Sequence, residues 1–244
     1  MNIGIVGMGI IGKAVQRLFP DAIGVDKYDD HRILNDFDFV FVCVPTPCCG
    51  DGLDMSIVRE VVNEIGDGPV IIICSALQPG TADGLSGNIV VQPEYFGESV
   101  AHPLTKLSEQ QFLILGGEKE NVDKVVELYK SVYNANIKIR KVTALEAEVI
   151  KLSENRAIAF KVAQCQELYD ACIRNGIDYD TIREAVYGDD PRFNLWWTFI
   201  YKDKRGFNSK CLPKDVYGWQ RWANGSDITD AVLRKNEEWI KSQY

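Results

Sequence analysis

The sequence has few of the residues that usually hold metal ions and no regular pattern of cysteines. Its only two histidines, His31 and His102, lie in different segments without a second ligand at regular spacing. The seven cysteines are an odd number and include no C-x-x-C pair. Zinc sites and disulfide frameworks usually show such spacings. We therefore expect no metal site, and we expect thiols in a reducing cytoplasm.

A basic excess and long apolar segments are also missing. The 244-residue chain carries a formal net charge of −8 and has a pI of about 4.9. Because a nucleic-acid-binding surface is normally basic, this charge argues against a nucleic-acid partner. No apolar run reaches the roughly 18 residues that a membrane span needs. The start, MNIGIVGMGIIG, lacks the basic region and cleavage site of a signal peptide, so we expect a cytoplasmic protein without a membrane partner.

Apolar runs alternate with helical segments in the first part of the chain. The runs typical of buried strands are NIGIVG, AIGVD, FDFVFVCVP, GPVIIICSA, GNIVVQPE and QFLILGG. Segments with helical spacing, such as DMSIVREVVNEIG and KENVDKVVELYKSVY, lie between them. This alternation predicts an α/β domain over residues 1–142, a Rossmann-like doubly wound parallel sheet.

A glycine motif stands at the first predicted turn of this domain. Gly7, Gly9 and Gly12 form G-x-G-x-x-G after a strand and at the start of a helix. They suit a tight turn, close approach of a pyrophosphate and close helix–sheet packing, respectively. A carboxylate at Asp26, after the second strand, suits the ribose hydroxyls of NAD and would repel a 2′-phosphate. The predicted NAD contacts of this region are Gly7, Gly9, Ile10, Ile11, Gly12, Asp26 and Lys27.

The second half predicts a helical domain over residues 143–244, beginning with one helix of about thirty residues. Thr143 and Glu146 fit a capping box, and the pair 175–176 (Asn-Gly) fits a stop. Such a helix spans roughly 50 Å. An apolar stripe on it indicates packing against another helix or a second subunit; its members are Ile158, Val162, Cys165, Tyr169 and Cys172.

The segment GFNSKCLPKD places Cys211 between two lysines and just before a proline. This cysteine could be a core residue, a metal ligand, a disulfide partner or a nucleophile. The arguments above weigh against metal and disulfide and leave core packing and nucleophilic catalysis open. Lys151 and Asn155 lie four residues apart on one face of the long helix, which by itself is typical of a solvated surface pair.

Five segments follow the glycine motif in order: VCVPTP with DGLDMS, QPEYFGES, AEVIKLSENRAIAF, DDPRF and GFNSKCLPKD. With them, the chain up to about residue 218 resembles the UDP-glucose/GDP-mannose 6-dehydrogenase family of nucleotide-sugar dehydrogenases. These enzymes oxidise a sugar C6 alcohol to a carboxylate with two NAD⁺ and no metal. The resemblance implies NAD as cofactor, a nucleotide sugar or smaller polyol as substrate, and a homodimer through the long helix.

The resemblance also implies roles by position. Cys211 matches the nucleophile that carries a thiohemiacetal and then a thioester. Lys151 and Asn155 match the pair that stabilises the oxyanion, and Asp215 matches a residue that positions water or the lysine. Proton transfer and thioester hydrolysis fall to the two glutamates of QPEYFGES, Glu94 and Glu98. The further implied contacts are Val44, Pro45, Thr46, Ser75 and Lys214 to the cofactor, and Tyr95, Phe96, Arg192 and Phe207 to the substrate.

The chain departs from the family pattern at four points. Ala76 stands where the family has a threonine after Ser75, the residues at 208–210 replace a glycine-rich loop, and Gly97 replaces a larger residue. The chain also ends in one amphipathic helix, so we expect a short form without the second nucleotide-binding domain. Two alternatives stay open: a catalytically silent NAD- or nucleotide-binding protein, and a two-electron dehydrogenase of a smaller hydroxy substrate.

Overall fold

The computed structural model describes residues 1–50, 52–97, 106–133 and 137–242. The chain divides into two compact units, which we call unit 1 (Met1–Lys151) and unit 2 (Leu152–Tyr244).

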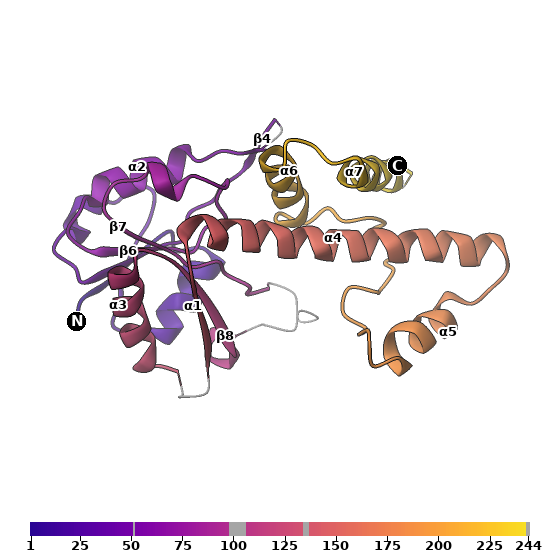
Figure 1. Ribbon diagram of the computed structural model, residues 1–244, viewed down its shortest axis with the longest axis horizontal. Coiled ribbons are helices and arrows are strands. Elements are labelled where there is room, and N and C mark those ends of the chain that lie inside the picture. Colours follow the sequence, from indigo (N-terminus) through magenta and orange to yellow (C-terminus); the bar gives the residue numbers. More distant parts are fainter. Residues whose placement is uncertain (51, 98–105, 134–136, 243–244) are drawn as a thin grey trace. The chain divides into compact units, whose positions relative to one another are not determined.

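A seven-stranded sheet forms the centre of unit 1 (Figure 1). Its order is β2-β1-β3-β6-β7-β8-β9, and all neighbouring strands are parallel except β7 and β8. The predicted α/β fold is confirmed, with one antiparallel pair in place of a wholly parallel sheet. The strands are β1 (Ile3–Val6), β2 (Ile23–Val25), β3 (Phe39–Val42), β6 (Val70–Ile73), β7 (Asn88–Val91), β8 (Phe112–Gly117) and β9 (Lys138–Val142). A separate antiparallel pair is formed by β4 (Cys48–Cys49) and β5 (Gly52–Leu53).

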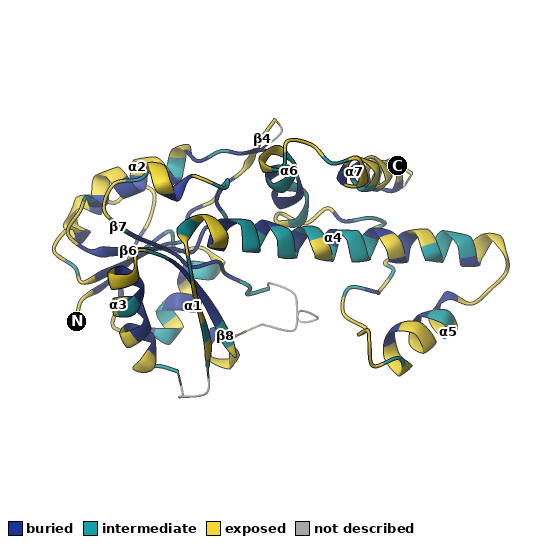
Figure 2. Ribbon diagram, viewed as in Figure 1, coloured by how far each residue is buried: buried dark blue, intermediate teal, exposed yellow. Residues whose placement is uncertain are grey.

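The central strands are apolar throughout because both faces of the sheet are covered. Every residue of β3 and β6 is buried. One face shares a core, which includes Ile5 and Phe41, with helices α1 (Ile10–Leu18) and α3 (Lys119–Lys130). Helix α2 (Ser56–Ile65) lies on the other face, as Figure 1 shows, and the strands between the layers are dark in Figure 2.

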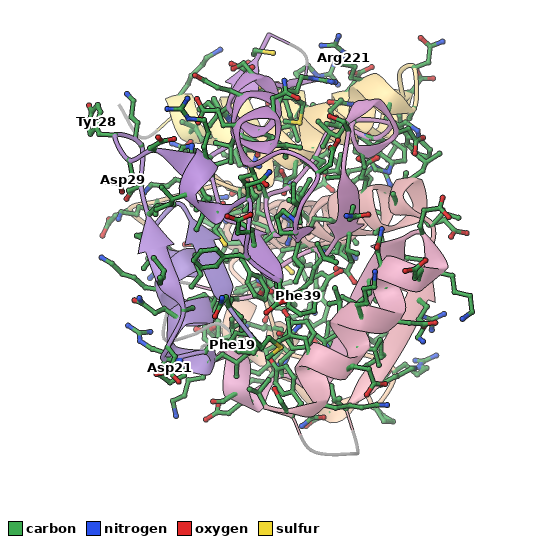
Figure 3. The ribbon with its side chains drawn as sticks, turned by 90° about the vertical axis from the view of Figure 1, so that its left-hand side faces the viewer. Phe19, Asp21, Tyr28, Asp29, Phe39 and Arg221 are labelled. Atoms are coloured by element: carbon green, nitrogen blue, oxygen red, sulfur yellow. The ribbon has the colours of Figure 1, made fainter. Side chains whose placement is uncertain are left out.

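The edges of unit 1 are exposed. In Figure 3, Phe19 and Phe39 point into the interior, whereas Tyr28 and Asp29 lie at the periphery beyond β2. Strand β9, which the apolar runs did not predict, alternates half-buried with exposed positions over most of its length and contains three basic residues. This pattern is typical of an edge strand, where one face and one backbone side meet water.

The first two turns of helix α4 (Ala144–Arg174) belong to unit 1. Gly116 has no side chain, and a Cβ there would stand 2.6 Å from the Cβ of Ala147. The buried carboxylate of Glu148 accepts hydrogen bonds from the backbone N–H groups of Gly80 (2.6 Å) and Ala82 (2.8 Å). These contacts join the first two turns of α4 to unit 1.

Both ends predicted for this helix are confirmed. Thr143 and Glu146 exchange the hydrogen bonds of a capping box, with the Thr143 N–H 2.7 Å from Glu146 Oε2. At the other end Gly176 adopts a φ of +65°, and the Ile177 N–H donates to the Cys172 carbonyl at 2.9 Å. A left-handed glycine with such a bond is a standard helix stop.

Unit 2 is helical. Besides α4 it contains α5 (Tyr179–Arg183), a π-helical turn (Glu184–Asp189), α6 (Leu212–Trp222) and α7 (Asp227–Lys241). Its apolar core comprises Ala159, Ala163, Phe207, Val216, Leu233 and Trp239. The stripe on α4 meets α5 through the rings of Tyr169 and Tyr179, whose centroids are 5.5 Å apart. Among the described residues, no helix combines the length and the apolar character that crossing a bilayer requires.

Candidate active site

The glycine loop after β1 has a geometry that only glycine allows at two of its positions. Gly7 has a φ of +91°, and a Cβ there would stand 2.7 Å from the carbonyl oxygen of Cys43. At Gly12 a Cβ would stand 2.1 Å from the Gly7 carbonyl oxygen. Both contacts are far shorter than a carbon and an oxygen tolerate, so the loop and α1 come this close only because the side chains are absent.

Gly9 is different because the space beside it is open. A Cβ at Gly9 would meet no atom within 4 Å. Gly9 directly precedes α1, whose first turn contains the exposed Ile10 and the half-buried Ile11. Backbone N–H groups in a first helical turn lack intrahelical partners and attract anions. The loop therefore has the space and the donors that a pyrophosphate needs.

This loop lies where the sheet changes direction. The chain passes from β1 to β2 on one side and then to β3 on the other side of β1. In open α/β sheets the crevice at the carboxyl ends of two such strands is the usual ligand site. The segment that follows β3 there has a buried Val44, an exposed Pro45 and a buried Thr46.

Asp26 directly follows β2 and is exposed beside this loop. The Gly7 N–H donates to the Val25 carbonyl at 3.0 Å, which ties the end of β2 to the glycine loop. The Asp26 carboxylate accepts from the Lys27 N–H at 2.9 Å and remains at the surface. Behind it, His31 Nε2 lies 3.3 Å from the Asp26 carbonyl oxygen. A surface carboxylate at this point suits a pair of ribose hydroxyls.

Ser75 has its hydroxyl turned toward the protein. It donates to the Val44 carbonyl at 2.7 Å and is buried. The hydroxyl therefore holds the segment after β3, and Ala76 next to it contributes no hydroxyl of its own. A cofactor contact by Ser75 stays a prediction.

Glu94 is a buried carboxyl at the end of the segment that follows β7. Its Oε1 accepts from Gln92 Nε2 at 2.8 Å, and Oε2 has no hydrogen-bond partner among the described residues. Burial raises the pKa of Glu94 to about 7, against the opposing effects of the Gln92 hydrogen bond and the Lys151 charge. A carboxyl that titrates near neutrality suits acid–base catalysis.

Lys151 and Tyr95 lie together in unit 1. The Lys151 Nζ is 4.9 Å from the centre of the Tyr95 ring, a cation–π distance. That ring in turn lies 5.0 Å from the ring of Phe112. Phe96 packs half-buried against the main core. The prediction for Glu98 falls outside the described residues.

The remaining predicted catalytic groups gather in unit 2, around the start of α6. Cys211 is exposed and is the N-cap residue of this helix. Asp215, in the first turn, is buried and receives hydrogen bonds from Asn155 Nδ2 (2.5 Å) and Lys214 Nζ (2.6 Å). The structure thus brings Asn155, Lys214 and Asp215 together beside the turn that Cys211 begins.

Two predicted substrate contacts have other partners. Arg192 is exposed and forms an ion pair with Asp190 at 2.6 Å. Phe207 is buried in the core of unit 2, and its backbone is held by both side-chain groups of Asn236. Neither finding tests a role toward substrate, and both roles stay predictions.

Three functional or supporting residues were missed by reasoning from the sequence: Gln92, Tyr129 and Glu148. Gln92 stands two positions before Glu94 in the QPEYFGES segment and could have been suspected. The contact of Tyr129 with Gln92 spans 37 residues and leaves no trace in local spacing. The structure has the seven cysteines as thiols. Across the described ranges, no group of three or more His, Cys, Asp or Glu side chains is placed to hold a metal ion.

The fold and the glycine loop define a dinucleotide-binding α/β protein, and comparison with known proteins narrows this class. Residues 145–239 match the UDP-glucose/GDP-mannose dehydrogenase family, central domain. The UDP-glucose 6-dehydrogenase of Rickettsia bellii is 26% identical over 223 residues, covering 84% of this chain and 50% of that protein. The UDP-N-acetyl-D-mannosamine dehydrogenase of Pyrococcus horikoshii is 27% identical over 209 residues, covering 79% and 47%.

Solved structures agree on the fold. A UDP-glucose dehydrogenase from the hyperthermophilic archaeon Pyrobaculum islandicum gives a TM-score of 0.82 at 21% identity, covering 97% of this chain and 68% of that one. The family-model match and these relatives agree with the resemblance found in the sequence motifs. It spans about half the length of the curated relatives it matches.

Proposed function

We propose that this protein is an NAD-dependent dehydrogenase that oxidises the C6 alcohol of a UDP-glucose-like nucleotide sugar to a carboxylate through a covalent bond to Cys211. The observation that carries the proposal is the cluster of Asn155, Lys214 and Asp215 beside the helix turn that Cys211 begins. This cluster lies within the stretch that matches the family's central domain.

The glycine loop and Asp26 would hold NAD⁺, with the open side of Gly9 facing the pyrophosphate and the Asp26 carboxylate on the ribose hydroxyls. Thr46 and the adjacent Val44 and Pro45 would border the same crevice. When bound, NAD⁺ would accept one hydride in each of two oxidation steps. Position 26 has a carboxylate and not a basic residue, so it would repel the 2′-phosphate of NADP⁺ and favours NAD⁺.

Cys211 carries the substrate between the two oxidations. Its thiolate adds to the C6 aldehyde, forming a carbon–sulfur bond, and the carbonyl oxygen takes a proton to give a thiohemiacetal. Loss of a hydride and a proton from this adduct leaves a thioester. Water then attacks the thioester carbonyl, the carbon–sulfur bond breaks, and the carboxylate, the Cys211 thiol and a proton are released. A helix N-terminus favours the thiolate that starts this sequence.

The polar groups around this chemistry have separate tasks. Lys151 and Asn155, four residues apart on α4, donate to the oxygen that gains negative charge. Asp215 fixes the Asn155 amide through the 2.5 Å hydrogen bond. Glu94, and Glu98 by its place in the same segment, take protons from the alcohol and from the attacking water. Arg192, Tyr95, Phe96 and Phe207 are proposed to contact the substrate or its surroundings.

The substrate is proposed to be a nucleotide sugar, with a smaller polyol as the next candidate, and the protein to be a homodimer through α4. The names of the matched relatives support the substrate class.

Static light scattering tests the dimer, for which the expected mass is twice 27.4 kDa.

The test of the activity is NADH absorbance. Purified protein is mixed with NAD⁺ and, separately, with UDP-, GDP- and TDP-hexoses, free sugars and polyols. We expect NADH from at least one nucleotide sugar and none from it with Cys211→Ser protein. Lack of NADH from every compound, with NAD⁺ binding confirmed calorimetrically, would contradict the proposed activity.

A catalytically silent NAD-binding protein is the second candidate, favoured by Ala76 and by the inward-turned hydroxyl of Ser75. Neither residue offers a hydroxyl that could order a catalytic water. In that case calorimetry shows NAD⁺ binding, but no NADH is formed from any compound. Ala76→Thr is then the substitution to test next.

A further inference from the structure

Three buried polar side chains in unit 1 form a continuous hydrogen-bonded chain. The Tyr129 hydroxyl donates to Gln92 Oε1, and Gln92 Nε2 donates to Glu94 Oε1 at 2.8 Å. The exposed fractions are 2% for Tyr129, 2% for Gln92 and 6% for Glu94. Buried polar groups of this kind are costly unless each has a partner, so the chain specifies one arrangement.

Each end of the Gln92 side chain is anchored by a rigid element. The Gln92 N–H donates to the Ile73 carbonyl of β6 at 2.9 Å, which fixes the backbone to the sheet. Tyr129, on α3, is held by neighbouring rings, with centroid distances of 6.0 Å to Phe19 and 6.4 Å to Phe41. Neither anchor can turn without disturbing the core.

The direction of these hydrogen bonds determines which way the Gln92 amide faces. Desolvation raises the pKa of Tyr129 well above its usual value, so its hydroxyl keeps its proton and acts as a donor. The amide oxygen of Gln92 accepts this hydrogen bond, which leaves the amide N–H₂ facing Glu94. A donor in this position favours the carboxylate form of Glu94 over the acid form.

We propose that Gln92, oriented by Tyr129, is the positioning residue of Glu94: it holds Oε1 and leaves Oε2 as the oxygen that exchanges a proton. Oε2 is buried and has no partner among the described residues, which is unusual for a carboxyl and calls for an explanation of this kind. The inference rests on the proposed function only for the reaction that Glu94 serves.

The other groups that face Glu94 do not duplicate this role. Lys151 is the only charged one among the described residues, and its charge lowers the Glu94 pKa less than the Gln92 hydrogen bond does. The Tyr95 backbone N–H lowers it less still. The remaining three are thiol or phenol groups whose own pKa values are raised, so they stay neutral near pH 7; they are Cys74, Tyr129 and Tyr133. Gln92 is therefore the main favourable contact of the Glu94 carboxylate.

The test is a carboxyl titration by NMR, which needs neither substrate nor activity. Protein is labelled at the glutamate side-chain carboxyl carbon, and the Glu94 resonance is assigned by its loss in Glu94→Gln. Gln92→Met removes both hydrogen bonds at similar side-chain length, and Tyr129→Phe frees the Gln92 amide to turn. We expect the Glu94 midpoint to rise by about one pH unit in both variants, the size expected for one charged hydrogen bond.

Tyr133→Phe is the matched control. Its hydroxyl donates at 2.8 Å to the Leu107 carbonyl, so its loss leaves the Gln92 amide in place and the midpoint unchanged. Equal midpoints in wild type, Gln92→Met and Tyr129→Phe would overturn the inference, as would a shift in Gln92→Met without one in Tyr129→Phe. Melting curves confirm that each variant is folded before titration.

Activity then separates this inference from the proposed function. If NADH is formed, the acid limb of the kcat–pH profile should move up with the NMR midpoint in both variants and stay in Tyr133→Phe. If no NADH is formed by wild type, the NMR midpoints still decide the role of Gln92. If the NMR midpoint of Glu94 moves but the kcat–pH profile does not, Glu94 is not the group that sets the acid limb of the reaction.

Discussion

Among the ionisable side chains of unit 1, Glu94 is the clearest example of one that is buried. It is 6% exposed, and burial raises the pKa of its carboxyl to about 7. A general base works only in its deprotonated form. We expect the rate of NADH formation to rise as pH increases through about 7, and we expect Glu94→Gln to lose this limb together with at least about 100-fold of kcat. A full kcat–pH profile of both proteins checks this, and an unchanged limb in Glu94→Gln would exclude Glu94 as its source.

The same group makes the stability of the fold depend on pH. The pKa of Glu94 is raised from 4.5 to about 7, so the folded state binds its proton more tightly than the unfolded state does. Stability from this group is therefore full below about 4.5 and is lost as pH rises toward 7. Glu94→Gln should match wild type near pH 4.5 and exceed it at pH 8 by on the order of 3 kcal/mol. Urea unfolding at both pH values measures the difference, and a pH-independent difference would refute it.

At two glycines of the loop after β1, one added methyl group should affect the stability of the fold differently. A Cβ at Gly12 would stand 2.1 Å from a backbone oxygen, whereas one at Gly9 meets nothing within 4 Å. Gly12→Ala should lower both the melting temperature, by about 2–4 °C per kcal/mol lost, and NAD⁺ binding. Gly9→Ala should keep the melting temperature and weaken NAD⁺ binding at least about tenfold. Calorimetric titration of both variants is the measurement, and unimpaired binding by Gly9→Ala would place the pyrophosphate elsewhere.

At the scale of elements, helix α4 is fixed to unit 1 by one buried carboxylate. Glu148 is 1% exposed and accepts from the N–H groups of Gly80 and Ala82. Glu148→Ala orphans two amides and should cost about 2–4 kcal/mol of unfolding free energy. Glu146→Ala, which removes only the exposed capping box, is the control and should cost about 1 kcal/mol. Equal losses in the two variants would show that the Glu148 hydrogen bonds carry no special weight.

Elements with strong local signals could be predicted, and those set by distant contacts could not. The runs at β3 and β6 are apolar on both faces, and Thr143 and Glu146 mark the start of α4 by their spacing alone. Strand β9 was missed because KIRKV reads as a charged segment until β8 supplies its partner. The antiparallel pairing of β7 with β8 could not be predicted, because the spacing of apolar residues does not indicate the direction of a strand.

The candidate site shows the same division. The glycines and Cys211 could be selected as candidates because their motifs are local. The Gln92–Tyr129 hydrogen bond joins segments 37 residues apart, and the Asn155–Asp215 bond joins segments 60 apart. Side chains can be matched by position to a known pattern, but their burial and partners require the folded chain. The burial of Phe207 in the core of unit 2 is one example, since nothing in the local sequence around it predicts this packing.

At the scale of the whole molecule, the proposed reaction draws on both units. Unit 1 contains the glycine loop, Glu94 and Lys151, and unit 2 contains Cys211 with Asn155 and Asp215. A protein that only binds NAD⁺ needs unit 1 alone. A two-electron dehydrogenase needs a base but no covalent sulfur. Only the four-electron oxidation uses both sets of groups, so its stoichiometry separates the three possibilities.

The most direct measurement is therefore the number of NADH molecules formed for each substrate molecule consumed, in wild type and in Cys211→Ser. Limiting nucleotide sugar is taken to completion with excess NAD⁺, and the product acid is quantified by mass spectrometry. We predict two NADH per substrate and a carboxylate product in wild type, and neither in Cys211→Ser. One NADH per substrate at an undiminished rate in Cys211→Ser would contradict covalent catalysis by Cys211.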